Sequence, residues 1–130
     1  MAMTLLVVDD AEWSAVTLEV ALLALPDTSV VRTGGGREAW SLIEKRPVSA
    51  IITDLHMPGM DGFELIERVR ATASTASIPI IVVSADGTPE TQDRVRQLGA
   101  DTFFVKPYSP AAVREKLEQL LHDPPSRDSV

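Results

Sequence analysis

The sequence predicts a single α/β domain in which five parallel strands form one sheet covered by helices on both faces. Short apolar runs alternate along the chain with longer stretches of helical periodicity. The runs are almost continuously apolar, which is typical of strands that are buried on both faces. Five strands joined by right-handed crossovers favour the doubly wound strand order 2-1-3-4-5.

The chain opens with a strand and a helix. An apolar run at Thr4–Val8 predicts the first strand. Helical spacing follows over Glu12–Ala24, and Pro26 cannot continue that helix because it lacks a backbone N–H. The apolar residues at helical spacing, which we expect to form its buried face, are Val16, Val20 and Leu23.

A second strand and helix lead to the third strand. β-branched residues favour a strand at Ser29–Thr33, and three glycines at 34–36 favour a turn after it. A helix is then expected over Arg37–Lys45 and ends before Pro47. Its expected buried residues are Ala39, Trp40 and Ile43. The third strand follows at Ala50–Thr53.

The second half of the chain repeats this alternation. A helix, a strand, a helix and a strand are expected in turn at Phe63–Arg70, Ile78–Val83, Glu90–Leu98 and Thr102–Val105. Gly99 suits the C-cap of the second of these helices, because glycine adopts the left-handed conformation without strain. Ser109 caps a last helix. The apolar residues on one face of that helix are Val113, Leu117, Leu120 and Leu121.

Composition limits the function. The 130 residues suit one domain, for which we expect residues 1–122, with 123–130 as a polar tail or linker that is disordered. The absence of cysteine excludes disulfides and thiolate sites. A net charge of −7 argues against direct nucleic-acid or anionic-membrane binding. No apolar run approaches the roughly 18 residues of a membrane span, and we expect a cytoplasmic protein.

Polar residues follow the strands that would lie at the centre of the sheet. In open parallel sheets ligands bind beyond the carboxyl ends of the strands, at the point where the strand order reverses. The first and third strands flank that point, and they end in Asp9–Asp10 and Asp54. Ser84 and Lys106 follow the fourth and fifth strands. We therefore expect three carboxylates, a hydroxyl and an ammonium to converge on one edge.

This set of groups suits phosphoryl transfer. Crowded carboxylates repel one another unless a cation lies between them, and Mg²⁺ prefers oxygen ligands of this kind. A metal ion and an ammonium neutralise the transferring oxygens, a hydroxyl donates to one of them, and a carboxylate can accept the group. The strand ends therefore predict Mg²⁺-dependent phosphoryl chemistry.

Four segments together resemble the receiver domain of response regulators in two-component signalling, which has a flavodoxin-like fold. They read LLVVDD, ITDLHMPGMDG, PIIVVSAD and GADTFFVKP. The resemblance extends from about Thr4 to Leu121. Their order and spacing make the resemblance specific, although each segment alone is a weak signal.

The resemblance implies how the acidic residues act. Asp54 stands where the family carries the aspartate that accepts a phosphoryl group from a histidine kinase or a phosphotransfer protein. Asp9 and Asp10 match the acidic pair that binds Mg²⁺, and of the two Asp10 is favoured as the direct ligand. Asp54 and the backbone carbonyl of His56 complete the implied metal site.

The resemblance also implies how the phosphorylated form would be read. Ser84 matches the hydroxyl residue that hydrogen-bonds the phosphoryl group, and Lys106 matches the lysine that pairs with it. Phe103 matches the switch aromatic, three residues before that lysine. Two positions tune the lifetime of the acyl phosphate in the family, and here they hold His56 and Asp86.

Two other classes of function stay open at this point. A Mg²⁺-dependent phosphatase of the haloacid dehalogenase type also uses a strand-end aspartate, but it needs a second aspartate where this chain has His56. A flavin-binding protein needs a Ser/Thr-rich phosphate loop where this chain has Asp9 and Asp10. Singly, Asp10 could be a helix N-cap and Phe103 a core residue.

The resemblance implies that the protein signals by a change of its surface and is not an enzyme that turns over a substrate. The expected output surface is the fourth helix, fifth strand and fifth helix, over about residues 90–121. Its last helix carries a mixed set of charges that favours a heterologous partner: Arg114, Glu115, Lys116 and Glu118. The output would be an unknown downstream protein, or an output domain if the chain is part of a longer regulator.

Overall fold

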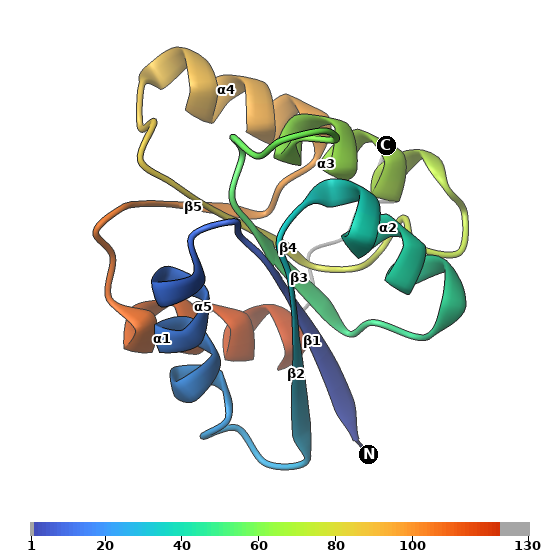
Figure 1. Ribbon diagram of the computed structural model, residues 1–130, viewed down its shortest axis with the longest axis vertical. Helices are drawn as coiled ribbons and strands as arrows, with labels where there is room; N and C mark the ends of the chain where they lie inside the picture. The colour runs from blue at the N-terminus through green and yellow to red at the C-terminus, as the bar shows by residue number, and fades with distance from the viewer. Residues whose placement is uncertain (1, 123–130) are drawn as a thin grey trace.

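The structure, a computed structural model, describes residues 2–122. Met1 and the expected tail, residues 123–130, lie outside the described residues. Strands and helices alternate as β1 (Met3–Val8), α1 (Glu12–Leu22), β2 (Thr28–Thr33), α2 (Gly36–Lys45), β3 (Ala50–Thr53), α3 (Gly62–Ala71), β4 (Ile80–Ser84), α4 (Pro89–Leu98), β5 (Thr102–Val105) and α5 (Pro110–His122) (Figure 1).

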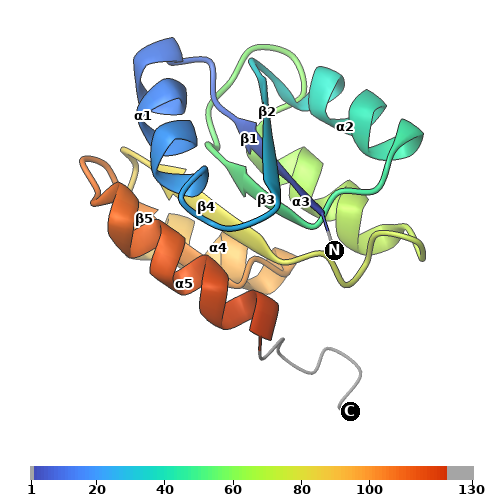
Figure 2. The same cartoon turned by 90° about the horizontal axis from the view of Figure 1, so that it is seen from below.

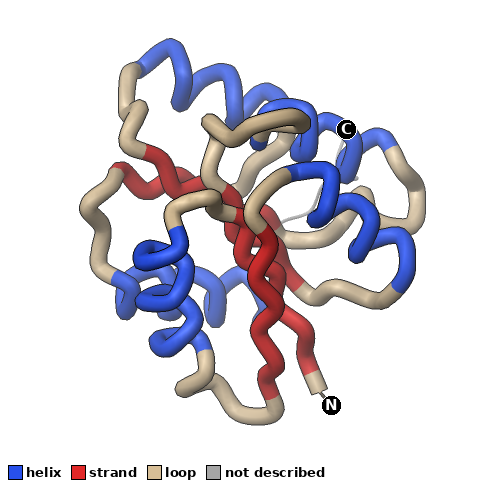
Figure 3. Tube along the Cα trace, in the orientation of Figure 1, coloured by secondary structure: helices blue, strands red, loops and turns tan. Residues whose placement is uncertain are grey.

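The predicted fold class is confirmed. The strands form one sheet in the order β2-β1-β3-β4-β5, and all four neighbouring pairs are parallel. In Figure 3 the strands run through the middle of the molecule, with helices on either side. β1 and β3 are adjacent and their crossovers leave in opposite directions, so the predicted reversal point lies at their carboxyl ends.

Two apolar clusters lie on opposite faces of the sheet. One packs β-strand residues such as Leu6 and Val8 against α2, α3 and α4. The other packs Leu5 and Val7 against α1 and α5 (Figure 2). Successive residues of a strand point to opposite faces. A strand covered on both faces therefore needs apolar residues throughout, which explains the continuous apolar runs.

The predicted buried face of α1 is wrong. Val16 is half-buried, and the side chains of Val20 and Leu23 are 67% and 51% exposed. The buried residues of α1 are instead Ala15, Leu18 and Leu22. Apolar residues occur all around this helix, so helical spacing allowed more than one face. Packing of α1 against α5 and β2 decides between them.

Other boundaries differ by one or two residues, and the caps are as expected. β4 begins at Ile80, where its pairing with β3 starts, and the carbonyl of Ile78 accepts a hydrogen bond of 2.6 Å from the Arg70 side chain. Gly99 ends α4 with φ of 113°. The hydroxyl of Ser109 accepts a 3.2 Å hydrogen bond from the Ala112 N–H. Within residues 2–122, no helix has the length and apolar character needed to cross a membrane.

Candidate functional site

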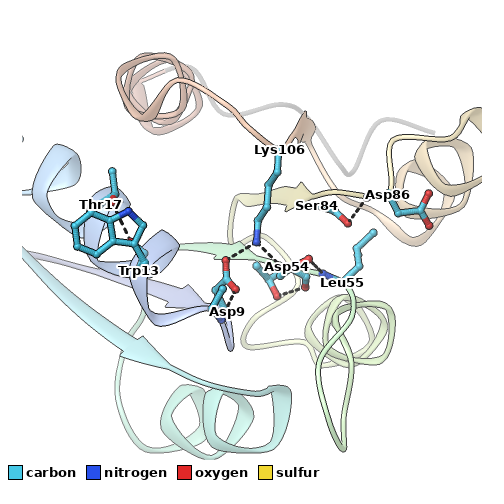
Figure 4. A network of polar contacts seen from close by, with 10 residues as sticks. Asp9, Trp13, Thr17, Asp54, Leu55, Ser84, Asp86 and Lys106 are labelled. Carbon is cyan, nitrogen blue, oxygen red and sulfur yellow. Dashed lines mark hydrogen bonds and ion pairs between the residues drawn. The ribbon is translucent and has the colours of Figure 1, made fainter.

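The structure brings the polar residues at the strand ends together. Asp9 follows β1, Asp54 follows β3, Ser84 ends β4 and Lys106 follows β5. In Figure 4 the Lys106 side chain extends from the end of β5 toward the carboxylates of Asp9 and Asp54. The arrangement follows from the parallel sheet, in which all the carboxyl ends lie along one edge.

Lys106 joins two of the carboxylates. Its Nζ donates to Asp54 Oδ2 at 2.8 Å and to Asp9 Oδ2 at 2.9 Å. Burial of the ammonium alone would lower its pKa, but the hydrogen bonds and charges of Asp54 and Asp9 outweigh that effect. The pKa of Lys106 therefore lies above its ordinary value of 10.5, and the side chain stays positive at neutral pH.

Backbone N–H groups orient the same two carboxylates. Asp54 Oδ1 accepts a hydrogen bond of 2.6 Å from the Leu55 N–H. Asp9 Oδ1 accepts one of 2.9 Å from the Ala11 N–H. Each carboxylate thus uses one oxygen for the backbone and the other for Lys106. Both aspartates are buried, so their oxygens are held in fixed positions.

The third carboxylate completes an acidic cluster. Carboxylate oxygens of Asp9, Asp10 and Asp54 all lie within 4.8 Å of one another, and Asp10 is exposed. Oxygen donors at this spacing, with one side open to water, fit Mg²⁺, which keeps several water ligands. His56 lies two residues beyond Asp54, in the loop that follows β3 at the same edge of the sheet.

Ser84 and Asp86 are linked on the β4 side of the site. The Ser84 side chain is fully buried, and its Oγ accepts a hydrogen bond of 3.1 Å from the Asp86 N–H. The peptide bond between Lys106 and Pro107 is cis, and the Lys106 N–H donates to the Ser84 carbonyl at 2.9 Å. The hydroxyl and the ammonium therefore come from adjoining strand ends.

The Asp86 side chain is held by the start of α4. It accepts hydrogen bonds of 2.9 Å from the Thr91 hydroxyl and 3.0 Å from the Thr88 hydroxyl, and His56 Nε2 lies 3.4 Å away. The Thr91 and Thr88 hydrogen bonds hold the pKa of Asp86 below its ordinary value of 3.8. The family resemblance pointed to His56 and Asp86 but not to these threonine contacts.

Phe103 lies apart from the polar contacts. It is half-buried on β5, opposite Val82, and packs against the cluster beneath α4. It also lines a groove of about 240 Å³ between α4 and β5. Phe103 is therefore a partly buried side chain at the surface of the α4–β5 region.

Tyr108 was not singled out from the sequence. With Trp13 and Lys106 it lines a groove of about 410 Å³ beside the acidic cluster. Burial raises the pKa of Tyr108 above 10.0, a hydrogen bond with Ser14 lowers it, and the charge of Asp9 raises it. No motif marks this residue, and only its place two residues after Lys106 could have pointed to it.

Comparison with known proteins identifies the family. Residues 5–118 match the family described as the response regulator receiver domain. The chain belongs to this family. The receiver domain is 37% identical over 120 residues to a chemotaxis protein CheY homolog of Campylobacter jejuni, covering 92% of each chain. It is 32% identical to chemotaxis protein CheY1 of Helicobacter pylori, covering 92% of this chain and 97% of the relative.

A solved structure agrees with this assignment. The receiver domain superimposes on the chemotaxis response regulator CheY4 of Vibrio cholerae with a TM-score of 0.84 and 28% identity. The match covers 93% of this chain and 100% of that one. The chain is thus a CheY-like receiver domain of two-component signalling, and the recognition drawn from its motifs is confirmed.

Proposed function

We propose that this receiver domain is a switch operated by phosphorylation of Asp54, with a histidine kinase or a phosphotransfer protein as donor. The donor's bond to phosphorus breaks, and a carboxylate oxygen of Asp54 forms the new bond to phosphorus. The observation that carries the proposal is the Asp54 carboxylate, 2.8 Å from the Lys106 ammonium and within an acidic cluster.

Mg²⁺ is the cofactor of this reaction in our proposal. Asp9, Asp10, Asp54 and the backbone carbonyl of His56 would hold it, because the clustered carboxylates supply the oxygen donors it prefers. When bound, Mg²⁺ neutralises the charge on the transferring oxygens. Lys106 already contacts Asp54 and would pair with a phosphoryl oxygen.

The signal would pass from Ser84 to the α4–β5–α5 surface. The buried Ser84 hydroxyl would lose its hydrogen bond from the Asp86 N–H and move toward the phosphoryl group. This movement would leave space for Phe103 to turn inward. Phe103 has no hydroxyl, so this step changes packing and exposed area alone. We propose that the changed surface is recognised by a downstream protein or by an attached output domain, in the cytoplasm.

The lifetime of the phosphorylated state depends on His56 and Asp86 in this proposal. Their side chains lie 3.4 Å apart and come from the loops that follow β3 and β4. Both loops border Asp54, so the two side chains control how water reaches its phosphoryl group. We expect Asp86→Ala to change the rate of dephosphorylation several-fold, which is on the order of the effect of losing one hydrogen bond. Phosphorylation of Asp54 in this variant should stay intact.

Intact mass spectrometry after treatment with acetyl phosphate and Mg²⁺ tests the proposal. The parent protein should gain one phosphoryl group, and Asp54→Asn should gain none. Asp93→Asn is the matched control, since Asp93 is an exposed residue of α4, and it should label like the parent. Full labelling of Asp54→Asn would place the acceptor elsewhere, and sustained release of phosphate would favour the phosphatase alternative.

A further inference from the structure

An arginine on α4 stacks on an aromatic ring beside the site. The Arg94 guanidinium carbon lies 3.8 Å from the centroid of the Phe63 ring. Phe63 is the second residue of α3, and only 7% of it is exposed. The Phe63 ring also makes an edge-to-face contact with the His56 ring. The two ring centroids are 6.0 Å apart, and the interplanar angle is 66°. Phe63 therefore lies between the arginine of α4 and the imidazole at the rim.

These contacts continue from His56 through Asp86 back to α4. His56 Nε2 lies 3.4 Å from Asp86, and Asp86 accepts a hydrogen bond of 2.9 Å from Thr91. Thr91 and Arg94 are three residues apart on α4, so they lie on neighbouring positions of one helix face. The series of contacts thus begins at Arg94 and ends at Thr91, both on α4. His56 is restrained from two sides although its side chain is 62% exposed.

We propose that Arg94 and Phe63 are positioning residues that hold His56 beside Asp86 and thereby control the rate at which the phosphoryl group on Asp54 is hydrolysed. This inference rests on the proposed function. In hydrolysis, water attacks phosphorus and the bond from phosphorus to the Asp54 oxygen breaks. The electron pair returns to the carboxylate, the hydroxyl leaves as part of inorganic phosphate, and the proton goes to solvent.

The burial of Phe63 explains why the ring can act as an anchor. Phe63 belongs to the apolar cluster under α2, α3 and α4, so its position is fixed by packing. His56 and Arg94 are both exposed, and each would sample other rotamers without the ring between them. Because α4 also belongs to the proposed output surface, a partner that draws Arg94 away from Phe63 would change the phosphorylated lifetime.

Decay of the phosphorylated protein after removal of acetyl phosphate tests the inference. We expect Arg94→Ala to change the decay rate about two- to fivefold, the rate equivalent of an exposed cation–π contact. Arg94→Lys keeps a cation over the ring and should restore part of the parent lifetime. Arg96→Ala is the matched control, because exposed Arg96 pairs with Asp93 at 2.8 Å, and it should decay like the parent.

A double-variant cycle separates positioning from a general structural effect. In a His56→Ala background there is no imidazole to position, so adding Arg94→Ala should leave the decay rate unchanged. An unchanged lifetime in Arg94→Ala alone, or an equal effect of Arg94→Ala with and without His56, would overturn the inference while labelling of Asp54 stands. Absence of labelling in the parent protein would overturn the proposed function, and this inference with it.

Discussion

The Lys106 ammonium lies 2.8 Å from the Asp54 carboxylate, although 52 residues separate the two along the chain. It bonds Asp9 at almost the same distance. One cation is thereby shared between two buried anions, while Asp10 adds a third negative charge from the exposed side of the cluster. Three carboxylates against one ammonium thus leave an excess of negative charge at this edge of the sheet.

Removal of the Asp10 charge should therefore stabilise the protein in EDTA and weaken its response to Mg²⁺. Asp10→Asn relieves repulsion without breaking a Lys106 ion pair, so we expect a gain of about 0.5–1 kcal/mol in the free energy of unfolding. Thermal unfolding with EDTA and with Mg²⁺ measures both effects. Glu115→Gln, an exposed change of equal charge on α5, should leave the Mg²⁺-induced rise in melting temperature intact. An equal Mg²⁺ response in Asp10→Asn and the parent would contradict a metal role for Asp10.

Tyr108 should titrate at a higher pH in the folded protein than in the unfolded chain. Burial favours the neutral phenol, which raises its pKa above 10.0. A raised pKa contributes stability below the unfolded pKa, and that stability is lost as the pH rises through the folded value. Tyr108 is the only tyrosine, so phenolate absorbance reports on it directly.

Ser14→Ala should shift the pKa of Tyr108 further in the same direction as burial does. The hydrogen bond with Ser14 lowers the pKa of Tyr108, so its removal should raise the titration midpoint further. Titration of the parent in denaturant provides the reference. A midpoint that stays the same on unfolding would mean that burial does not perturb the phenol.

Trp13→Ala should change stability far less than the size of the side chain suggests. Trp13 is 83% exposed on α1, whereas Leu18 on the same helix is 1% exposed. We expect a change within about 0.5 kcal/mol for Trp13→Ala and a loss of about 2–5 kcal/mol for Leu18→Ala. Urea denaturation of both variants makes the comparison. A large loss in Trp13→Ala would show that the indole packs against the protein in solution.

Gly62→Ala should disturb the strand end that carries Asp54. A Cβ at Gly62 would overlap the backbone oxygen of Asp54 and the Cα of Leu55. We expect a destabilisation of about 1–3 kcal/mol by chemical denaturation, together with slower labelling of Asp54. Gly34→Ala is the control, since no heavy atom lies within 4 Å of the added carbon. Equal stability of the two variants would show that the α3 entry relaxes without cost.

The elements most reliably predicted from the sequence are those whose signal is local. β3 and β5 have the predicted bounds, because in each a short apolar run lies directly between polar residues that end it on both sides. The end of α4 at Gly99 was also predicted, since its φ of 113° favours glycine. For α1 the local signal failed, because apolar residues on several sides of one helix leave the buried face undetermined.

The candidate site divides in the same way. The sequence by itself determined that Asp9, Asp54, Ser84 and Lys106 stand at strand ends, and a parallel sheet places all such ends on one edge. Only the tertiary structure decided that Lys106 bonds both Asp9 and Asp54, and that Arg94 reaches Phe63. Those contacts depend on the relative placement of α3, α4 and the loops, which packing across the sheet determines and which no spacing along the chain encodes.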